Sequence, residues 1–338
     1  MAKKLFAGVD AGGTKTDCIV VNENGQFLAR ATGKAGNTAV GRSSAIANIK
    51  QTLLQAAQLL DLAPDYETIF LGISGLNSRR DKILVEQQLR ESFQDQDPRQ
   101  AQISYQRLDA QNDIQALHAA AFRGRPGIVL ICGTGSNCYG RAADGLEWQA
   151  GGLDYVFTDE GSAYDLALRA IKRILRGVDG REPPAPILSG VFCGQMQVDN
   201  YGEFSTWLHR DEASRYKNKI ADLAPLVDAA IKLGCPHAQR VFEEAMDSLV
   251  ELILAVARKL DWSLVEKQGI GITGGVVTHE IGNTILLERL RLKVDTANIF
   301  VPDLSPAAGA AIRALQLGGI EFTNEVEQTF YKAIVKQS

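Results

Sequence analysis

The sequence lacks several features that would place the protein in well-known classes. No run of about 18 apolar residues is present, so no membrane-spanning helix is predicted. The N-terminal residues Met1–Phe6 lack the apolar segment of a signal peptide, and the five cysteines form no Cys-x-x-Cys pair. Both points favour a cytoplasmic protein with reduced thiols. Hydrolase and P-loop readings have no support, because neither a G-x-S-x-G elbow nor a Walker-type GxxxxGK motif occurs.

Charge and histidine content exclude further classes. The net charge is −4 and no basic run occurs, which argues against nucleic acid as a partner. The four histidines are scattered and make no zinc-spaced set. With 338 residues the chain is long enough for two domains with a core in each.

What the sequence does contain is a glycine-rich turn that occurs twice, each time after an apolar strand pattern. The first glycine turn, Gly12–Thr16, follows Leu5–Val9, and the second glycine turn, Gly133–Ser136, follows Ile128–Cys132. Glycine lets backbone N–H groups approach an anion closely, and Thr or Ser adds a further donor. Because two such turns can bind a polyphosphate from both sides, the sequence predicts an enzyme that handles phosphate.

Strand and helix patterns alternate along the chain, which is typical of an α/β fold. The duplicated hairpin predicts two similar α/β halves that face each other across a cleft. The Gly- and Pro-containing segment Arg123–Gly127 marks the crossing, so we expect one domain over 1–122 and a second over 123–338, whose last helices can pack back on the first domain. The proline-rich segment Gly177–Asp199 is predicted to be an irregular surface excursion.

Ordered motifs across nearly the whole chain resemble those of the sugar kinase/actin/heat-shock chaperone ATPase superfamily. Gly8–Thr16 is similar to its first phosphate motif, Gly133–Ser136 to its second, and Gly271–Val276 to its adenosine motif. Within that superfamily the chain most resembles the N-acetylglucosamine kinase-like branch of the BadF/BadG/BcrA/BcrD ATPase type. The motifs specific to that branch are Ile131–Asn137, Thr158–Ala163 and Ser305–Ala311.

The resemblance implies a fold and two cofactors. The fold is α/β, with two ribonuclease H-like (actin-like ATPase) domains and a nucleotide cleft between them, and the cofactors are ATP and Mg²⁺. Asp10 is implied to hold the metal through water, with a polar strand-end residue as the alternative. For Lys15 a solvated hairpin charge is the alternative to a phosphate contact. The implied nucleotide-binding residues are Gly12, Gly13, Thr14, Lys15, Thr16, Gly133, Thr134, Gly135, Ser136, Gly274, Gly275 and Ala308.

Phosphoryl transfer to a hydroxyl needs positioning, charge neutralisation and one proton acceptor. Two carboxylates are candidates for that acceptor, Asp109 and Asp113, and the match to the family motif favours Asp113 as the catalytic base. A helix N-cap is the alternative role for Asp113. The predicted sugar-binding residues are Asn37, Asp113, Ser136, Asn137, Gly152, Asp154 and Asp159, of which Asp154 has no counterpart in the family pattern. The alternative for Asn37 is a turn-forming residue, and the alternative for Asp159 is a position in the capping segment of the next helix.

The chain departs from the family in the loop that sets specificity. Gly151-Gly-Leu153-Asp154-Tyr155 stands where the family has Gly-Gly-Trp-Gly, so a large apolar wall is lost and a carboxylate is gained. Asp154 is either a ligand for an amino group or a solvated loop charge. We therefore expect a kinase for the 6-hydroxyl of an amino sugar, with N-acetylglucosamine first. Glucosamine, N-acetylmannosamine-like and muramyl-type sugars remain open.

Two other functions occur among relatives of this superfamily. One is the ATPase activator of a CoA-ester reductase or dehydratase, which carries an iron–sulfur cluster between subunits. The cysteines show no obvious cluster pair, although Cys193 remains a candidate thiolate. The other is a sugar-sensing regulator, which would need a DNA-binding extension. The resemblance alone predicts a homodimer.

Overall fold

The computed structural model describes residues 4–38, 41–60, 65–94, 102–199, 202–210 and 216–335. The chain forms two compact units: unit 1 comprises residues 1–125 and 302–338, and unit 2 comprises residues 126–301. The crossing between the units lies next to the predicted boundary at 122/123, and the C-terminal segment belongs to the first unit, on which the last helices were expected to pack.

Unit 1 is built on a five-stranded sheet in the order β3-β2-β1-β4-β5. Strand β1 pairs antiparallel with β2 and parallel with β4, and β4 pairs parallel with β5. The carboxyl ends of β1, β4 and β5 therefore lie at one edge of the sheet. The strands are β1 (Leu5–Ala11), β2 (Lys15–Asn22), β3 (Phe27–Lys34), β4 (Asp65–Ile73) and β5 (Ser104–Asn112).

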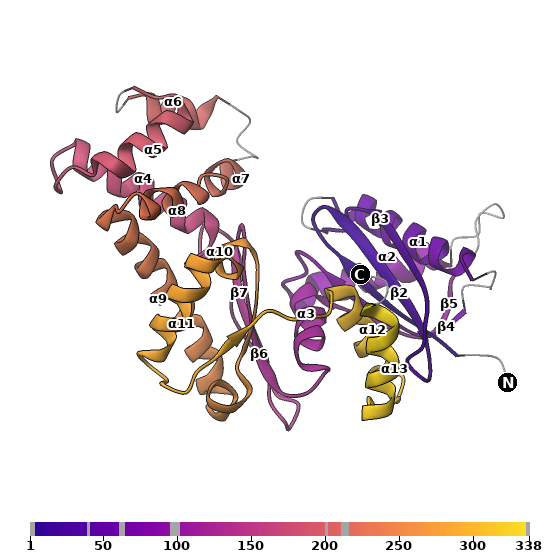
Figure 1. Cartoon of the computed structure of the whole chain (residues 1–338). Helices are drawn as coiled ribbons and strands as arrows, with labels where there is room; N and C mark the ends of the chain where they lie inside the picture. Colours follow the sequence, from indigo (N-terminus) through magenta and orange to yellow (C-terminus); the bar gives the residue numbers. More distant parts are fainter. Residues whose placement is uncertain are drawn as a thin grey trace. The chain divides into compact units, whose positions relative to one another are not determined.

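Five helices are found among the described residues of unit 1. In Figure 1 the yellow C-terminal helices α12 and α13 lie against the indigo strands of this unit. Ser305 caps the N-terminus of α12, where its side chain accepts from the Ala308 N–H, and Pro306 occupies the first turn. The helices are α1 (Arg42–Gln58), α2 (Arg79–Phe93), α3 (Asp113–Phe122), α12 (Pro306–Leu317) and α13 (Asn324–Val335).

Helix α12 is rich in small residues because it packs with its backbone against β1 and α3. A Cβ added to Gly8 of β1 would lie 1.9 Å from the Ala311 nitrogen, and one added to Gly309 of α12 would lie 1.9 Å from the Ala116 carbonyl oxygen. Only glycine fits at such an approach. The motif Ser305–Ala311 is thus explained by packing within unit 1.

We predict that Gly309→Ala destabilises the protein by about 3 kcal/mol or more, because neither backbone at this contact can move away without breaking its own helix. Thermal or denaturant unfolding measures the effect. Gly190→Ala is the control: this exposed helical glycine has no atom within 4 Å of the added Cβ, so a small gain in stability is expected. Equal effects at the two positions would contradict the packing argument.

Unit 2 repeats the arrangement of strands seen in unit 1. Its five-stranded sheet has the order β10-β9-β6-β7-β8, in which β6 pairs antiparallel with β7 and parallel with β9. The duplicated hairpin in the sequence thus reflects a duplicated sheet. The strands are β6 (Gly127–Cys132), β7 (Ser136–Arg141), β8 (Glu147–Gly151), β9 (Ile270–Thr273) and β10 (Ile299–Phe300).

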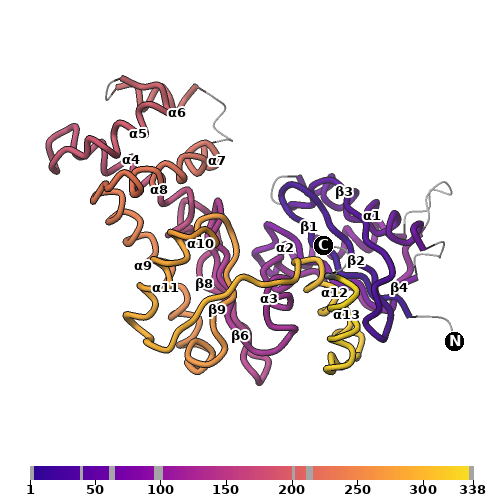
Figure 2. The backbone as a smooth tube through the Cα atoms, in the orientation of Figure 1, coloured from indigo at the N-terminus to yellow at the C-terminus, as the bar shows by residue number. Residues whose placement is uncertain are grey.

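Most of the core of unit 2 lies between its sheet and its helices. Figure 2 shows α9 and α11 side by side, and the buried residues of α9 form the centre of this core. The helices of unit 2 are α4 (Ala163–Val178), α5 (Pro186–Met196), α6 (Glu203–His209), α7 (Tyr216–Ala221), α8 (Pro225–Lys232), α9 (Pro236–Lys259), the π-helix η2 (Leu264–Gln268), α10 (Gly275–Thr278) and α11 (Glu280–Arg291).

The predicted irregular excursion over Gly177–Asp199 is wrong, because it contains the regular helix α5. Pro186 starts the helix at a position where proline is tolerated, and Leu188, Phe192 and Met196 are buried in the core. Helical spacing of these three residues was the signal, and the prolines before it obscured that signal.

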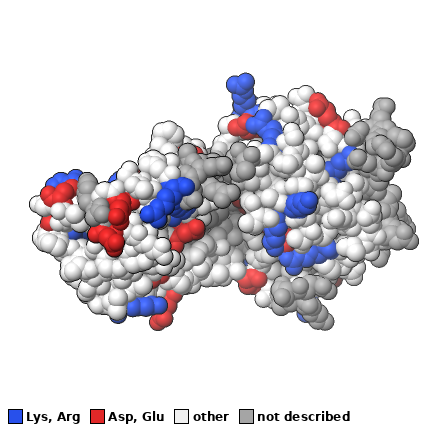
Figure 3. Space-filling model, turned by 90° about the horizontal axis from the view of Figure 1, so that it is seen from above, with Lys and Arg blue, Asp and Glu red and all other residues white. Residues whose placement is uncertain are grey.

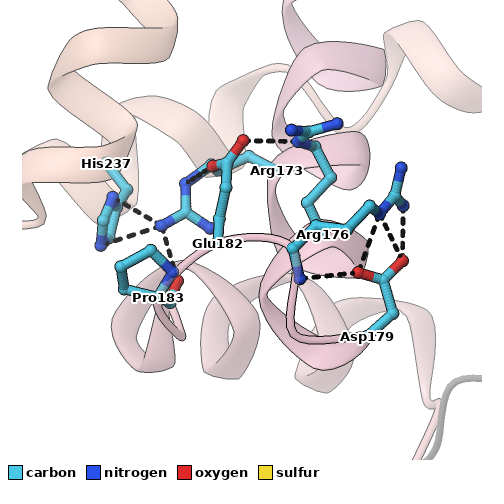
Figure 4. A network of polar contacts seen from close by, with 7 residues as sticks. Arg173, Arg176, Asp179, Glu182, Pro183 and His237 are labelled. Carbon is cyan, nitrogen blue, oxygen red and sulfur yellow. Dashed lines mark hydrogen bonds and ion pairs between the residues drawn. The ribbon is translucent and has the colours of Figure 1, made fainter.

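A polar network fastens the loop before α5 to its surroundings (Figure 4). Arg173 of α4 forms an ion pair with Glu182 at 3.0 Å and donates to the Pro183 carbonyl at 2.8 Å. Its guanidinium also contacts the His237 ring of α9 at 2.9 Å. Burial and the charge of Arg173 lower the pKa of His237, so the neutral ring is favoured in this network.

Figure 3 shows how charged side chains are distributed over one face of the molecule. On the face seen in Figure 3, basic and acidic side chains are interspersed among uncharged residues. Within the part of the chain that the structure describes, no helix has the length and apolar character needed to span a membrane.

Candidate functional site

Polar side chains of unit 1 gather at the carboxyl ends of β1, β4 and β5. Asp10 lies at the end of β1, Ser74 follows β4, and Asp113 follows β5. The Ser74 hydroxyl donates to the Asp113 carboxylate and accepts from Asn37 Nδ2 at 3.5 Å. The Ser74 backbone N–H donates to the Ala11 carbonyl at 3.0 Å. Ser74 therefore connects Asp113, Asn37 and the end of β1.

The two carboxylates of this cluster have raised pKa values. Burial, and then the charges of Asp113 and Asp17, raise the pKa of Asp10 to about 7, while Lys15 acts in the opposite direction. Burial also raises the pKa of Asp113, against the hydrogen bonds from Ser74 and the backbone. A carboxylate with a raised pKa is a better proton acceptor, and two neighbouring carboxylates attract a divalent cation.

The structure separates the roles of the residues around Asp113. The N-cap of α3 is Asn112, whose side chain accepts from the Ile114 N–H, so Asp113 is the first helical residue and not the cap. Asp109 forms an ion pair with Lys82 of α2 at 3.2 Å and accepts from Gln111 at 2.8 Å. These contacts give Asp109 a structural role between β5 and α2, which favours Asp113 as the proton acceptor.

Only some of the predicted phosphate-binding residues of the first glycine turn are exposed. Gly13, Thr14 and Lys15 are exposed at the tip, and Gly12 closes the turn by donating its N–H to the Lys15 carbonyl at 2.9 Å. Thr16 is buried, and its hydroxyl donates to the Lys34 carbonyl at 2.7 Å. This is a correction to the prediction: the Thr16 side chain holds β2 to β3 and is not available to a phosphate.

In the second glycine turn, too, the tip is exposed and the last hydroxyl residue is buried. Thr134 is exposed, whereas the Gly133 N–H donates to the Gly135 carbonyl at 3.0 Å. The Ser136 side chain is buried and donates to the Glu160 carbonyl at 2.7 Å. The predicted nucleotide and sugar contacts of the Ser136 hydroxyl are therefore corrected to a link between this turn and the segment that carries Asp159.

A cavity of about 540 Å³ opens beside the second glycine turn in unit 2. Gly274, at φ +100, allows its strand end to approach β6, because an added Cβ would lie 2.3 Å from the Cys132 carbonyl oxygen. The cavity is large enough for a nucleoside and is mostly apolar. Its lining residues are Gly133, Thr134, Ala163, Leu166, Ala221, Asp222, Ala224, Pro225, Asp228, Gly275, Val276 and His279.

A contact between a histidine and an aspartate in this cavity wall was not predicted from the sequence. His279 Nε2 lies 3.3 Å from Asp228 Oδ2, which joins α8 to the start of α11. His279 Nδ1 accepts from the Gly282 N–H at 3.4 Å, so the ring is held at both nitrogens. Burial raises the pKa of Asp228, and His279 acts against that shift. No local pattern relates these two residues, because the tertiary fold alone brings them together.

Ala308, the remaining predicted nucleotide-binding residue, lies in unit 1. It belongs to α12 of unit 1, where its side chain is fully buried and its N–H donates to Ser305 Oγ at 3.3 Å. The side chain of Ala308 thus has a core position in unit 1, and its contact with the nucleotide stays a prediction.

Asp159, the predicted sugar ligand, is buried beside the second glycine turn. Lys217 of α7 donates to Asp159 Oδ2 at 2.7 Å, and the side chain of Asp159 is 5% exposed. No motif in the sequence points to Lys217. Asn137 packs under Gly152: an added Cβ on that glycine, at φ +73, would lie 2.5 Å from the Asn137 Cγ.

The loop after β8 carries the departure from the family pattern. Asp154 is exposed, and its carboxylate accepts from the Val156 N–H at 2.9 Å, so this carboxylate stabilises its own turn. Thr158 Oγ1 accepts from the Leu153 N–H at 2.9 Å and closes the same loop. Leu153, Val156 and Phe157 are exposed and form an apolar surface on it.

The carboxylates near the first glycine turn suit a metal ion that is held mainly by water and by the phosphates of a nucleotide. Among the residues described, no group of three or more His, Cys, Asp or Glu side chains could hold a metal ion. Mg²⁺ is commonly bound through one or two carboxylates, water and the phosphates of a nucleotide. The carboxylate of Asp10 at the end of β1 fits that mode of binding.

Comparisons with known proteins give consistent matches over most of the chain. The model of the BadF/BadG/BcrA/BcrD ATPase family matches residues 7–314. An N-acetyl-D-glucosamine kinase from Dictyostelium discoideum is 28% identical over 93% of this chain and 99% of its own length. An N-acetylmuramic acid/N-acetylglucosamine kinase from Clostridium acetobutylicum is 26% identical over 82% of this chain and 87% of its own.

A solved structure gives a match of similar extent. It is a candidate N-acetylglucosamine kinase from Chromobacterium violaceum, which is 27% identical to this chain. The match has a TM-score of 0.69 and covers 93% of this chain and 99% of that one. The fold therefore extends along nearly the full length of both proteins.

Proposed function

The chain belongs to the BadF/BadG/BcrA/BcrD ATPase family, and from that premise we propose that it is an ATP-dependent kinase for the 6-hydroxyl of an amino sugar, with N-acetylglucosamine as the first candidate. The observation that carries the proposal is the cluster of Asn37, Ser74 and Asp113 beside Asp10, next to a glycine turn with an exposed tip. The names of two relatives that match over most of the chain point to the same reaction.

In this proposal the exposed tip of the second glycine turn binds phosphates of ATP, and the cavity beside Gly274 and Gly275 binds the nucleoside. The exposed tip of the first glycine turn is proposed as the phosphate-binding element of unit 1. Asp10 would hold a magnesium ion through water, and that ion would neutralise phosphate charge. Asp113 accepts the proton of the sugar 6-hydroxyl as its oxygen attacks the γ-phosphorus. Ser74 orients the Asp113 carboxylate for that step.

Asn37 and Asp159 are proposed to bind sugar hydroxyls, together with Asn137 and the backbone at Gly152. The Asp154 carboxylate already accepts a backbone N–H within its loop, which weakens the case for a free amino group as its ligand. The exposed apolar side chains of the same loop suit an acyl substituent better. This favours N-acetylated sugars over glucosamine. A homodimer in the cytoplasm remains our expectation.

The activator function is the second candidate, and the cysteines argue against it. Cys18, Cys132, Cys138 and Cys235 are buried, and Cys193 is only partly exposed. A cluster shared between subunits requires thiolates at the surface. An anaerobic preparation that is colourless and free of iron would agree with the kinase proposal.

The test of the proposed function is ADP release from ATP–Mg²⁺ with a panel of sugars. The panel contains N-acetylglucosamine, N-acetylmuramic acid, N-acetylmannosamine, glucosamine and glucose. We expect strong stimulation by N-acetylglucosamine and a weaker response to glucosamine. Slow ATP hydrolysis that no sugar stimulates would overturn the proposal.

The cavity in unit 2 yields a prediction about the nucleotide. His279→Ala removes a ring that lines the cavity, so the KM for ATP should rise about tenfold, which corresponds to about 1.4 kcal/mol. Steady-state kinetics at saturating sugar measure this change. His237→Ala, in the separate network of Figure 4, is the control and should leave the KM for ATP unchanged. An unaltered KM in His279→Ala would place the nucleoside elsewhere.

A further inference from the structure

Lys217 of α7 lies where the second glycine turn meets the segment that carries Asp159. Its ammonium is 2.7 Å from Asp159 Oδ2. A Cβ added to Gly135 would lie 2.5 Å from Asp159 Oδ2 and 3.2 Å from Lys217 Nζ. The absence of a side chain at Gly135 is thus what lets this ion pair lie directly against the turn.

The ammonium has more hydrogen-bonding capacity than this pair uses. Lysine carries three N–H donors, and the bond to Asp159 uses one of them. The ring of Tyr155 lies 5.4 Å from Nζ, so the ammonium also makes a cation–π contact. The Lys217 side chain is 30% exposed, so a ligand at the turn can reach it.

The sequence of the second glycine turn shows why a cation is needed there. The first glycine turn carries its own lysine, Lys15, whereas Gly133–Ser136 contains no basic residue. The nearby Asp159 carboxylate would also repel a phosphate if it were uncompensated. Lys217, from a distant part of the chain, neutralises that carboxylate and places its ammonium N–H donors beside the turn.

We propose that Lys217 is a catalytic residue whose ammonium binds the oxygens of the transferring phosphoryl group. The inference rests on the proposed kinase activity. In the step, the sugar oxygen forms a bond to the γ-phosphorus while the bond from that phosphorus to the bridging oxygen of ADP breaks. ADP leaves with the electron pair, and the hydroxyl proton goes to Asp113. Lys217 exchanges no proton and stabilises the charge on the equatorial oxygens.

The test compares Lys217→Gln and Lys217→Arg with Lys219→Gln. Lys219 is the matched control, because it lies on the same helix and its ammonium donates to the Trp207 carbonyl. We expect Lys217→Gln to lower kcat by about 10²–10³-fold, with the KM for the sugar within about threefold of wild type. Lys217→Arg should recover at least about tenfold of the loss, since it restores the charge. Lys219→Gln should match the wild type.

Binding measurements separate this role from a structural one. In Lys217→Gln, affinity for the β,γ-imido analogue of ATP should fall at least about tenfold, while affinity for adenosine stays unchanged. A variant with a higher KM for the sugar, unaltered kcat and unaltered affinity for the analogue would show that Lys217 only holds Asp159, and would overturn the inference. If the wild type phosphorylates no sugar, the proposed function fails, and the loss of affinity for the analogue still decides whether Lys217 binds the phosphates.

Discussion

Asp113→Asn is expected to lower kcat for sugar phosphorylation by about 10²–10⁴-fold, the usual contribution of a general base. The amide keeps the shape of the side chain and can still bond to Ser74, but it cannot accept the hydroxyl proton. Binding of ATP should change little, because Asp113 is proposed to contact the sugar hydroxyl. Initial rates and nucleotide titrations measure the two effects separately.

The fold should tolerate this change. Asn112 and not Asp113 caps α3, so the helix keeps its first hydrogen bond. Burial raises the pKa of Asp113, which means that its ionised form costs folding free energy, and the neutral amide removes that cost. Asp109→Asn is the matched control: it weakens the pair with Lys82 and should leave kcat within a few-fold of wild type. A larger loss in Asp109→Asn than in Asp113→Asn would reverse the assignment.

Asp10→Asn should make the unliganded protein more stable at pH 8 and much less active. The folded-state pKa of about 7 lies above the ordinary value of 3.8, so the protonated form is favoured by folding. The associated stability is fully present below pH 3.8 and is lost as the pH rises through 7. The variant is uncharged at every pH, so its advantage should be absent at pH 4 and on the order of 2–4 kcal/mol at pH 8.

Thermal unfolding at the two pH values, without nucleotide, measures this difference. ATP with Mg²⁺ should stabilise the wild type more than Asp10→Asn, because only the carboxylate can hold the ion through water. Loss of the Asp10 carboxylate should also raise the Mg²⁺ concentration needed for half-maximal activity. A variant that is less stable than wild type at pH 8, with an unchanged requirement for Mg²⁺, would contradict the role given to Asp10.

The amino-acid sequence by itself determined the α/β fold, the duplicated hairpin and the family. These features are local: apolar runs predict strands, and glycine with a hydroxyl residue predicts the turns, so order along the chain suffices to recognise them. The roles of Asp10 and Asp113 were predicted from motifs that resemble those of the family, and these roles stay predictions. The prolines before α5 led to the wrong prediction of an irregular segment. The segment is helical because its apolar residues are buried in the core, which its composition does not reveal.

The tertiary structure alone decided which side chains meet. Thr16 and Ser136 look like phosphate ligands in the sequence, yet each hydroxyl donates to a carbonyl in a neighbouring segment. The segment that carries Ala308 returns to unit 1, because the glycine and alanines of α12 pack there against β1 and α3. Ser74 beside Asp113, His279 beside Asp228, and Lys217 beside Asp159 are far apart in the chain. Hydrogen bonds and ion pairs between distant residues leave no period or motif in a single sequence, so only the fold reveals them.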